Sequence, residues 1–291
     1  MDTTGRVVAG FGDIDRPFYM RSASKPFQAA VVVDLGVDLP DEHLALVCSS
    51  QDATSTHRSI IRAILADGGL TEADLACPPA RPGSMSADRM AATAGDTAPS
   101  RIMHYCAGKH AGMLRACLAQ GWDIDGYLDP GHPLQRAIHS HMSEVGALVD
   151  DAIGVDGCGA PVFRVDAASA ATAFATLLHP RHDRVWRAMH RFPALVSGSG
   201  NVDAVIAVGL DGVAKTGAEG LLAVTVRGRG ALAVRCWDGS ERAVAATARS
   251  ALLQLGWVGD RSPLVSALDR PVLGGGRTVG TVRAVFGLED R

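Results

Sequence analysis

Only three lysines occur in the 291 residues, and each lies in a short motif whose residue types can do chemistry. They are Lys25, Lys109 and Lys215, and the remaining side chains of the Lys and Arg type are all arginine. Most solvated positions need only a positive charge, so arginine can replace lysine there. Lysine differs from arginine because it can lose its proton when it is buried or crowded by other cations. A neutral amine can act as a general base or a metal ligand, so these three positions are the first candidates for a functional site.

Ser22 and Lys25 are three residues apart at the predicted start of a helix over 22–36. Residues at this spacing share one helix face, so the hydroxyl and the amine can meet. A desolvated lysine beside a serine can accept the hydroxyl proton and turn the serine into a nucleophile. The alternative is a capped helix with a solvated lysine. The scarcity of lysine favours the functional interpretation.

Lys215, Thr216 and Gly217 form a second motif late in the chain. A Ser-x-x-Lys motif followed by Lys-Thr-Gly is the motif order of the penicillin-recognising serine acyl-transferases. In such folds the Lys-Thr-Gly strand lines the cleft beside the nucleophile, and Gly217 would let a substrate approach the backbone closely. The alternative is a lysine at a strand edge next to a turn.

Cys106, Lys109 and Cys158 form the third group. Two thiolates and one nitrogen suit a tetrahedral Zn²⁺ site with one position left open. The spacing of three places Cys106 and Lys109 on the same side of a helix start. The alternative is two buried cysteines with a lysine ion pair, and composition alone favours that alternative.

The bulk composition excludes several classes of function. A net charge of -3 and a pI of about 6.3 provide no basic face for nucleic acid or for an anionic membrane. Aromatic residues make up 5%, which argues against a base-stacking platform or a sugar-binding cleft. No apolar run approaches membrane-spanning length, and Met1–Val8 lacks the pattern of a signal peptide. We therefore expect a cytoplasmic protein whose six cysteines are reduced.

Hydrophobic periodicity predicts an α/β (α+β) fold in a single domain spanning 1–291. The antiparallel sheet is expected from N- and C-terminal segments, about 1–21 and 200–291, with a helical insertion over about 22–199. Residues 44–48 are expected to be a short buried strand or a helix end, and 71–100 an irregular excursion with a short helix. The other predicted helices are 57–66, 108–119, 133–149, 167–178, 182–191 and 243–255, and the predicted strands are 7–12, 202–208, 221–226, 231–236, 271–273 and 279–286.

Several long motifs in one order carry a family resemblance. They are Arg-Ser-Ala-Ser-Lys-Pro-Phe-Gln at 21–28, Cys-Ala-Gly-Lys-His-Ala-Gly-Met at 106–113, Gly-Tyr-Leu at 126–128 with His-Pro-Leu-Gln at 132–135, Asp-Gly-Cys-Gly-Ala-Pro at 156–161 and Lys-Thr-Gly-Ala-Glu-Gly at 215–220. Together they resemble the bacterial asparaginase II family, in its zinc-associated type from Rhizobium etli, from Arg6 to Phe286. The resemblance favours the metal interpretation over its alternative.

The resemblance implies a fold similar to the serine β-lactamases and glutaminases, and hydrolysis of L-asparagine to L-aspartate and ammonia. It implies that Ser22 is the nucleophile or its partner, that Lys25 is the base and that Lys215 belongs to a second serine–lysine pair. A homodimer is implied as well. Zn²⁺ and a water would be held by Cys106, Lys109 and Cys158, and the substrate would be contacted by Arg21, Ser50, Asp52, His110, Asp156 and Gly217.

The chain departs from the family pattern after a short Cys-containing segment. Family members carry a Ser-His-Ser-Gly-Glu-like stretch there, and the second serine is replaced by Asp52 in this sequence. Lys215 would then face a carboxylate, which holds a lysine protonated. Either Ser22 and Lys25 suffice, or Ser50 or Thr54 substitutes for the missing serine, or the activity is altered.

A second departure lies at the N-terminus. Family members have an additional upstream strand that forms a hairpin with the predicted strand 7–12, and without it a sheet edge is exposed. Either the start lies upstream, or the protein is shortened.

Two other functions stay open at the level of the sequence. One is a different serine-type amidase that acts on glutamine, a β-lactam or another small amide. The other is a catalytically impaired, zinc-containing homologue that binds amino acids, which the change to Asp52 motivates.

Overall fold

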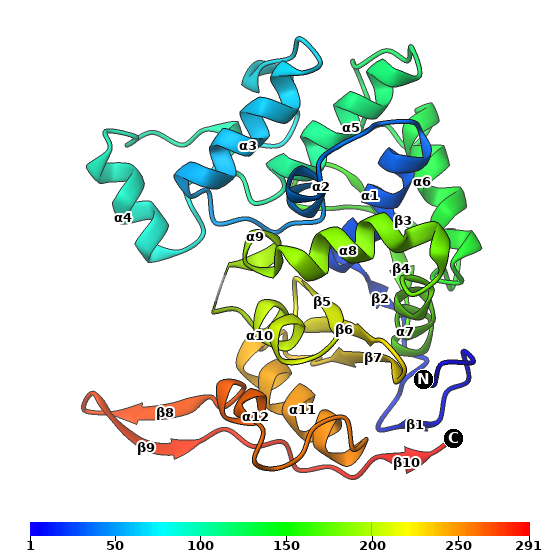
Figure 1. Ribbon diagram of the computed structural model, residues 1–291, viewed down its shortest axis with the longest axis vertical. Coiled ribbons are helices and arrows are strands. Elements are labelled where there is room, and N and C mark those ends of the chain that lie inside the picture. Colours follow the sequence, from blue (N-terminus) through cyan, green and yellow to red (C-terminus); the bar gives the residue numbers. More distant parts are fainter. Residues whose placement is uncertain (199) are drawn as a thin grey trace.

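The computed structural model describes residues 1–198 and 200–291, which fold as a mixed α+β structure with small antiparallel sheets. Most of the helices lie together above a central three-stranded sheet, and the last helices and strands lie below it (Figure 1). The described helices are α1 Lys25–Asp34, α2 Asp41–Val47, α3 Ser55–Ala66, α4 Met85–Thr93, α5 Ala107–Ala119, α6 Pro133–Glu144, α7 Ala167–Thr176, α8 Asp183–Arg191, α9 Pro193–Ser197, α10 Val202–Gly209, α11 Glu241–Gln254 and α12 Pro263–Ala267.

The strands form separate sheets rather than one continuous sheet. Antiparallel pairing joins β1 to β10, β2 to β4 and β4 to β3, β5 to β6 and β6 to β7, and β8 to β9. Their bounds are β1 Ala9–Gly10, β2 Phe18–Tyr19, β3 Ile153–Val155, β4 Pro161–Val165, β5 Gly212–Gly217, β6 Leu221–Val226, β7 Gly230–Arg235, β8 Pro271–Gly274, β9 Arg277–Thr281 and β10 Glu289–Asp290.

The central β5–β6–β7 sheet separates two hydrophobic cores. Successive strand residues point to opposite faces, and in β6 Leu221 and Ala223 join the larger core while Leu222 and Val224 join the smaller one. The larger core also contains the helices of the first two thirds of the chain, including α7, whereas the smaller one contains α11. All residues of β6 are buried because helices cover both faces of the sheet.

Both chain ends lie beside this sheet, as expected, but they do not extend it into a larger sheet. β1 pairs with β10, and each of these strands has two residues. Met1 reaches the edge of the central sheet, where it exchanges two backbone hydrogen bonds with Ala231 of β7. The prediction of one sheet built from about 1–21 and 200–291 is therefore too simple.

The prediction of a strand over 202–208 was wrong, because this segment forms helix α10. Its β-branched residues favour a strand in isolation, but tertiary packing overrides such local preference. In the helix, Val202 and Ile206 share one face and pack in the smaller core, while Asp203 reaches Thr216 on β5. The expectation of a helix end at 44–48 is confirmed, because α2 covers Asp41–Val47 and Cys48 is its C-cap. Residues 282–286 follow β9 and are not a strand.

Two glycines set the distance between α2 and α5, the helices that flank the candidate site. A Cβ atom at Gly108 would lie 2.2 Å from the carbonyl oxygen of Leu46, and one at Gly112 would lie 2.7 Å from Val47. Only glycine permits this close helix packing. The motif at 106–113 therefore positions its functional side chains through its small residues.

Across the described residues, no helix is both long enough and apolar enough to cross a membrane.

Candidate functional site

Lys25 is the first residue of α1 and is fully buried. Its Nζ donates hydrogen bonds to the carbonyl oxygen of Ser49 at 2.7 Å and to the hydroxyl of Ser50 at 2.9 Å. Pro26 follows it in the first turn, where the missing backbone donor does no harm. The helix thus starts at the site and places the amine against the segment that follows α2.

Burial lowers the pKa of Lys25 from 10.5 to about 8, and the nearby charges of Lys215 and Lys109 act in the same direction. The thiol groups of Cys106 and Cys158 oppose this shift. At pH 7.5 a lysine with a pKa of about 8 is neutral in roughly a quarter of molecules, against about one in a thousand at a pKa of 10.5. Lys25 can therefore act as a base near neutral pH.

Ser50 belongs to the loop between α2 and α3, and several contacts fix this loop. Its backbone N–H donates to Val196 at 2.8 Å. The side-chain amide of Gln51 donates to the carbonyl oxygen of His104 at 2.7 Å and accepts from the N–H of Ala53, whose φ of 56° is in the left-handed region. The loop ends at Thr54, which caps α3 in a reciprocal pair with His57.

Ser22 lies in the short 3-10 turn over Arg21–Ser24, just before α1. Its carbonyl oxygen accepts from the N–H of Lys25, but its hydroxyl makes no hydrogen bond to any residue of 1–198 or 200–291. The structure therefore brings Lys25 to Ser50, whereas Ser22 lies one turn before the lysine. Arg21 begins this turn with a φ of 51°, an uncommon value for a residue with a side chain.

Gly217 ends β5 and packs directly against the chain that leads into this turn. A Cβ atom there would lie 2.7 Å from the carbonyl oxygen of Met20. The close approach that sequence reasoning assigned to a substrate is thus made by the protein's own backbone. Gly217 holds the turn with Ser22 against the sheet.

Lys215 is fully buried on β5, and its charged partner is Asp203 of α10. The Nζ lies 3.3 Å from Asp203 Oδ2, which also accepts from the backbone N–H and the hydroxyl of Thr216. Burial alone would raise the pKa of Asp203, but Lys215 and the hydrogen bonds from Thr216 hold it below its ordinary value. The prediction that Lys215 faces Asp52 was wrong, because its carboxylate partner is Asp203.

Asp52 is half-buried beside Gly198, where an added Cβ would lie 2.5 Å from its Oδ2. Burial raises the pKa of Asp52, and the charge of Asp203 raises it further. Its carboxyl group forms no hydrogen bond or ion pair with the described residues. Asp52 thus offers an unengaged acidic group close to Ser50 in the chain.

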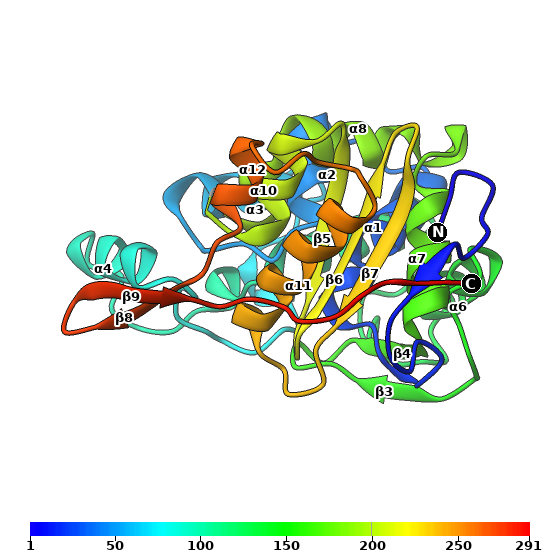
Figure 2. The same ribbon diagram turned by 90° about the horizontal axis from the view of Figure 1, so that it is seen from below.

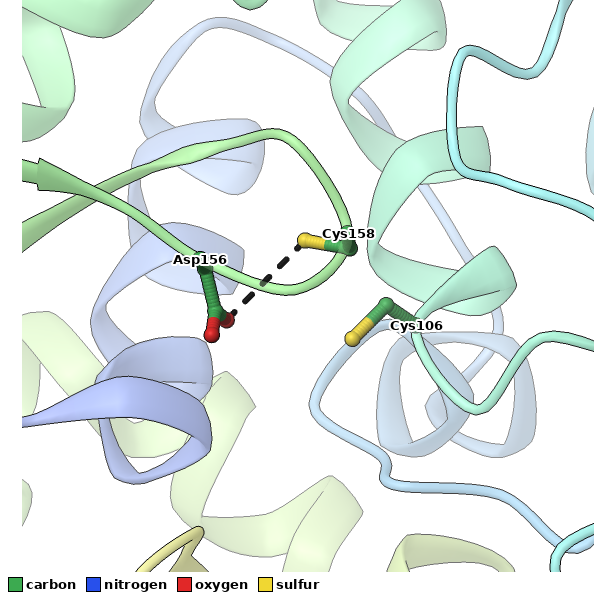
Figure 3. A group of neighbouring side chains, drawn as sticks. All are labelled: Cys106, Asp156 and Cys158. Carbon is green, nitrogen blue, oxygen red and sulfur yellow. Dashed lines mark hydrogen bonds between the residues drawn. The ribbon is translucent and has the colours of Figure 1, made fainter.

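The two cysteines of the third motif meet at the start of α5. Cys106, Asp156 and Cys158 place two sulfur atoms and a carboxylate oxygen within 4.8 Å of one another (Figure 3). The hydrogen bond from Cys158 is the largest influence that holds the pKa of Cys106 well below its ordinary value, and the charges of Lys25 and Lys109 add to it. The same bond and burial raise the pKa of Cys158. These opposite shifts favour the thiolate form at Cys106 and the thiol form at Cys158.

This donor set fits a zinc ion. Zinc–sulfur bonds of about 2.3 Å in a tetrahedral site place two sulfur atoms roughly 3.8 Å apart. The Cys106 and Cys158 sulfur atoms lie within 4.8 Å of each other, so zinc binding would require them to approach by no more than about 1 Å. Lys109 is buried next to them; burial lowers its pKa, but the neighbouring Cys158, Cys106 and Asp156 outweigh this and raise it. Without a metal, the Lys109 ammonium balances the thiolate charge.

His110 is buried on the same helix, and burial holds its pKa well below the ordinary value. Its Nδ1 lies 2.6 Å from the hydroxyl of Tyr127, and this hydroxyl accepts from the N–H of Ala76 at 3.0 Å. The tyrosine hydroxyl can donate its own hydrogen to Nδ1 while it accepts from Ala76, and a neutral His110 would then carry its hydrogen on Nε2. Within the described residues this Nε2 has no partner.

A series of ion pairs connects Asp156, which lies beside the two cysteines, with the edge of the central sheet. Arg21 Nε lies 2.6 Å from Asp156, and Arg21 Nη1 lies 3.0 Å from Glu219. Glu219 in turn lies 3.5 Å from Arg235 of β7. Glu219 has a φ of 67°, so two members of this series of ion pairs, Arg21 and Glu219, have left-handed backbone conformations.

A buried lysine amine against a serine hydroxyl is the arrangement of a serine hydrolase that uses lysine as its base. The family model for L-asparaginase II matches residues 1–284, so the chain belongs to that family. The family supports a hydrolase that acts on amides. No curated protein matches the chain in a sequence comparison.

Sequence reasoning missed Asp203 and the ion pairs of Arg235. Asp203 is a single acidic residue within the apolar stretch 202–208, and an acid in such a run is a sign of a buried partner. Glu219 belongs to the motif at 215–220, but the sequence alone did not predict its ion pairs with Arg21 and Arg235.

Proposed function

We propose that this protein hydrolyses L-asparagine to L-aspartate and ammonia with Lys25 as the general base. The observation that carries the proposal is the contact between the buried Lys25 amine and the hydroxyl of Ser50. Membership of the L-asparaginase II family supports the substrate class. The proposal also includes a homodimer, a cytoplasmic location and a fold similar to the serine β-lactamases.

In the proposed reaction, neutral Lys25 accepts the hydroxyl proton of a serine, whose oxygen attacks the side-chain amide carbon of the substrate. Lys25 then gives this proton to the leaving nitrogen, so that ammonia departs and a serine ester remains. Water hydrolyses the ester with Lys25 again as base. Ser50 is the hydroxyl in contact with Lys25, and Ser22 is the other candidate nucleophile.

The charged groups around the serines provide opposite anchors for an amino acid. We assign Arg21 to the substrate α-carboxylate and the carboxyl group of Asp52, which forms no hydrogen bond with the described residues, to the α-ammonium. A bound ammonium would favour the charged form of Asp52, against the burial that raises its pKa. Lys215, paired with Asp203, acts as a fixed positive charge rather than as a second base.

Ammonia release from L-asparagine by the pure, zinc-loaded protein tests the proposal. Ser22→Ala and Ser50→Ala are then compared by single-turnover kinetics and by mass spectrometry of the trapped serine ester, which identifies the nucleophile. The matched control is Ser140→Ala, an exposed serine on α6 that is expected to leave turnover unchanged. No ammonia from the wild type, while a known asparaginase is active in the same assay, would contradict the proposal.

Zinc would be held by Cys106, Cys158 and a third donor, for which Lys109 is our choice over Asp156. When bound, zinc supplies positive charge that keeps the thiolates in place and organises the pocket. We expect zinc binding at pH 7.5 to release about two protons, one from the Cys158 thiol and one from the Lys109 ammonium, because a metal ligand must be deprotonated. Calorimetry in two buffers with different ionisation enthalpies measures this number.

The variant Lys109→Met provides the control for the third donor. With Lys109 as ligand, the variant should release about one proton and bind zinc more weakly. Release of about one proton by the wild type, unchanged in Lys109→Met, would assign the third position to Asp156 instead.

A further inference from the structure

A pocket of about 360 Å³ lies between α6 and the hairpin of β3 and β4, at the end of the molecule where α7 also lies (Figure 2). This volume is typical of sites that bind small molecules. One wall comes from Pro130 and the first two turns of α6, and the other comes from Asp151, β3 and β4. The pocket contains neither Lys25 nor the cysteines of the candidate metal site, so it is a separate site.

Two opposite charges line this pocket, and neither has an ion-pair partner in residues 1–198 and 200–291. Arg136 of α6 is exposed, and its guanidinium donates to the carbonyl oxygen of Gly131 but reaches no carboxylate there. Asp151 is exposed as well and makes no side-chain hydrogen bond in that part of the chain, whereas the neighbouring Asp150 pairs with Arg164 at 3.0 Å. Because no ion pair joins Arg136 to Asp151, a ligand that carries both charges can lie between them.

A buried side-chain amide adds a hydrogen-bond acceptor to the pocket. Gln135 of α6 belongs to the lining and is 2% exposed. Its Nε2 donates to the carbonyl oxygen of Tyr127 at 2.8 Å, so the donor end of the amide is already engaged. Its Oε1 has no partner among the described residues. Because a buried polar group without a hydrogen bond is costly, a ligand that donates to this oxygen gains binding free energy.

The rest of the lining is apolar or aromatic. Ile153, Pro161 and Phe163 form the wall on the side of β3 and β4. His139 of α6 packs against Phe163 with the two ring centroids 5.3 Å apart. An apolar side chain gains free energy when it is buried against such a wall, whereas an amide or a carboxylate loses its hydration without finding a partner. The wall therefore favours an amino acid with an apolar side chain over asparagine or aspartate.

We propose that this pocket binds an apolar α-amino acid such as L-leucine as a zwitterion. Arg136 binds the carboxylate, while Asp151 and the Oε1 of Gln135 accept hydrogen bonds from the ammonium. The side chain of the ligand packs on the wall formed by β3 and β4. The site lies outside the residues proposed for the hydrolysis of L-asparagine, so it does not depend on that activity.

A ligand-observed NMR titration with L-leucine tests this proposal without any turnover. Two analogues separate the charges: isocaproate lacks the ammonium and isopentylamine lacks the carboxylate, and each should bind about tenfold more weakly than leucine. Arg136→Gln should weaken leucine binding about tenfold and leave isopentylamine binding unchanged. Asp151→Asn should also weaken leucine binding and leave isocaproate binding unchanged. Both substitutions are at exposed positions, so the fold is retained.

Two control variants separate this pocket from other sites. Arg21→Gln removes the cation proposed to bind substrate at the catalytic site, and Arg89→Gln removes an exposed arginine of α4 outside the pocket. Both should bind leucine within about twofold of the wild type. Leucine should also slow amide exchange in segments 135–140 and 151–155 of the wild type.

The proposal is overturned if leucine neither binds nor protects these segments at tens of millimolar. It is also overturned if Arg136→Gln and Asp151→Asn both bind leucine as tightly as the wild type. Loss of leucine binding in Arg21→Gln would overturn it too, because the amino acid would then occupy the catalytic site.

Discussion

Replacing Lys25 with methionine is expected to lower kcat/KM for L-asparagine by about 10²–10⁴-fold, with little change in fold. Methionine fills a similar buried volume, but it cannot accept a proton, and a positioned general base contributes about 10²–10⁴-fold. Ser50 also loses its hydrogen-bond partner. Initial rates of ammonia release and thermal unfolding measure the two effects separately.

The matched control is Gln28→Met, which makes a buried polar side chain of the same helix apolar. Gln28 is 2% exposed, and its Oε1 has no partner in the part of the chain that the structure describes. This variant should keep kcat/KM within about threefold of the wild type. An equal loss in both variants would mean that the effect is one of packing, and would exclude Lys25 as the base.

The pH dependence of the wild type provides an independent check of Lys25. Only the neutral amine is a base, so kcat/KM should rise with pH and level off above the pKa of about 8 that burial gives Lys25. The rising limb should be absent from the residual activity of Lys25→Met. A midpoint near 10 would mean that the lysine is solvated during catalysis and would contradict its proposed role.

Removing the carboxylate of Asp203 is expected to have the largest effect on stability. Asp203 is 1% exposed and Lys215 is fully buried, so Asp203→Ala leaves an unpaired buried charge. Breaking a buried ion pair in this way costs about 3–5 kcal/mol in the free energy of unfolding. Urea unfolding monitored by circular dichroism measures the change.

Two further variants separate the charge effect from general damage. Asp203→Leu combined with Lys215→Met should recover most of the loss, because no charge is then buried. Glu144→Ala, which removes a partner of exposed Arg181, should cost less than about 1 kcal/mol. A double variant that is no more stable than Asp203→Ala would show that Lys215 is not the source of the loss.

The sign of the pH effect on stability follows from the same pair. The pKa of Asp203 is lower in the folded protein than its ordinary 3.8. Its contribution to stability is therefore complete above about pH 4 and is lost as the pH falls through the folded value. The acid limb of the stability curve should be weaker in the double variant.

Local spacing predicts which of the candidate residues share a turn or a helix start. Ser22 and Lys25 belong to one turn and helix start, and Cys106 and Lys109 to another. The contact of Lys25 with Ser50 depends instead on a loop held by Gln51, which no local pattern predicts. The long-range contacts of the site therefore could not be predicted from the sequence.

The errors in the predicted fold have the same origin. Local preference favours a strand at 202–208, yet packing in the smaller core makes it a helix. This helix supplies Asp203, so the error in secondary structure also concealed the partner of Lys215.

The ion pairs that run from Asp156 through Arg21 and Glu219 to Arg235 connect the two cysteines with the central sheet. A zinc ion that took Asp156 as a ligand would compete with Arg21 for the same carboxylate. Arg21 is also the proposed anchor of the substrate α-carboxylate, so metal and substrate would then share one arginine. Linkage makes any such effect reciprocal: the factor by which zinc alters substrate affinity equals the factor by which substrate alters zinc affinity.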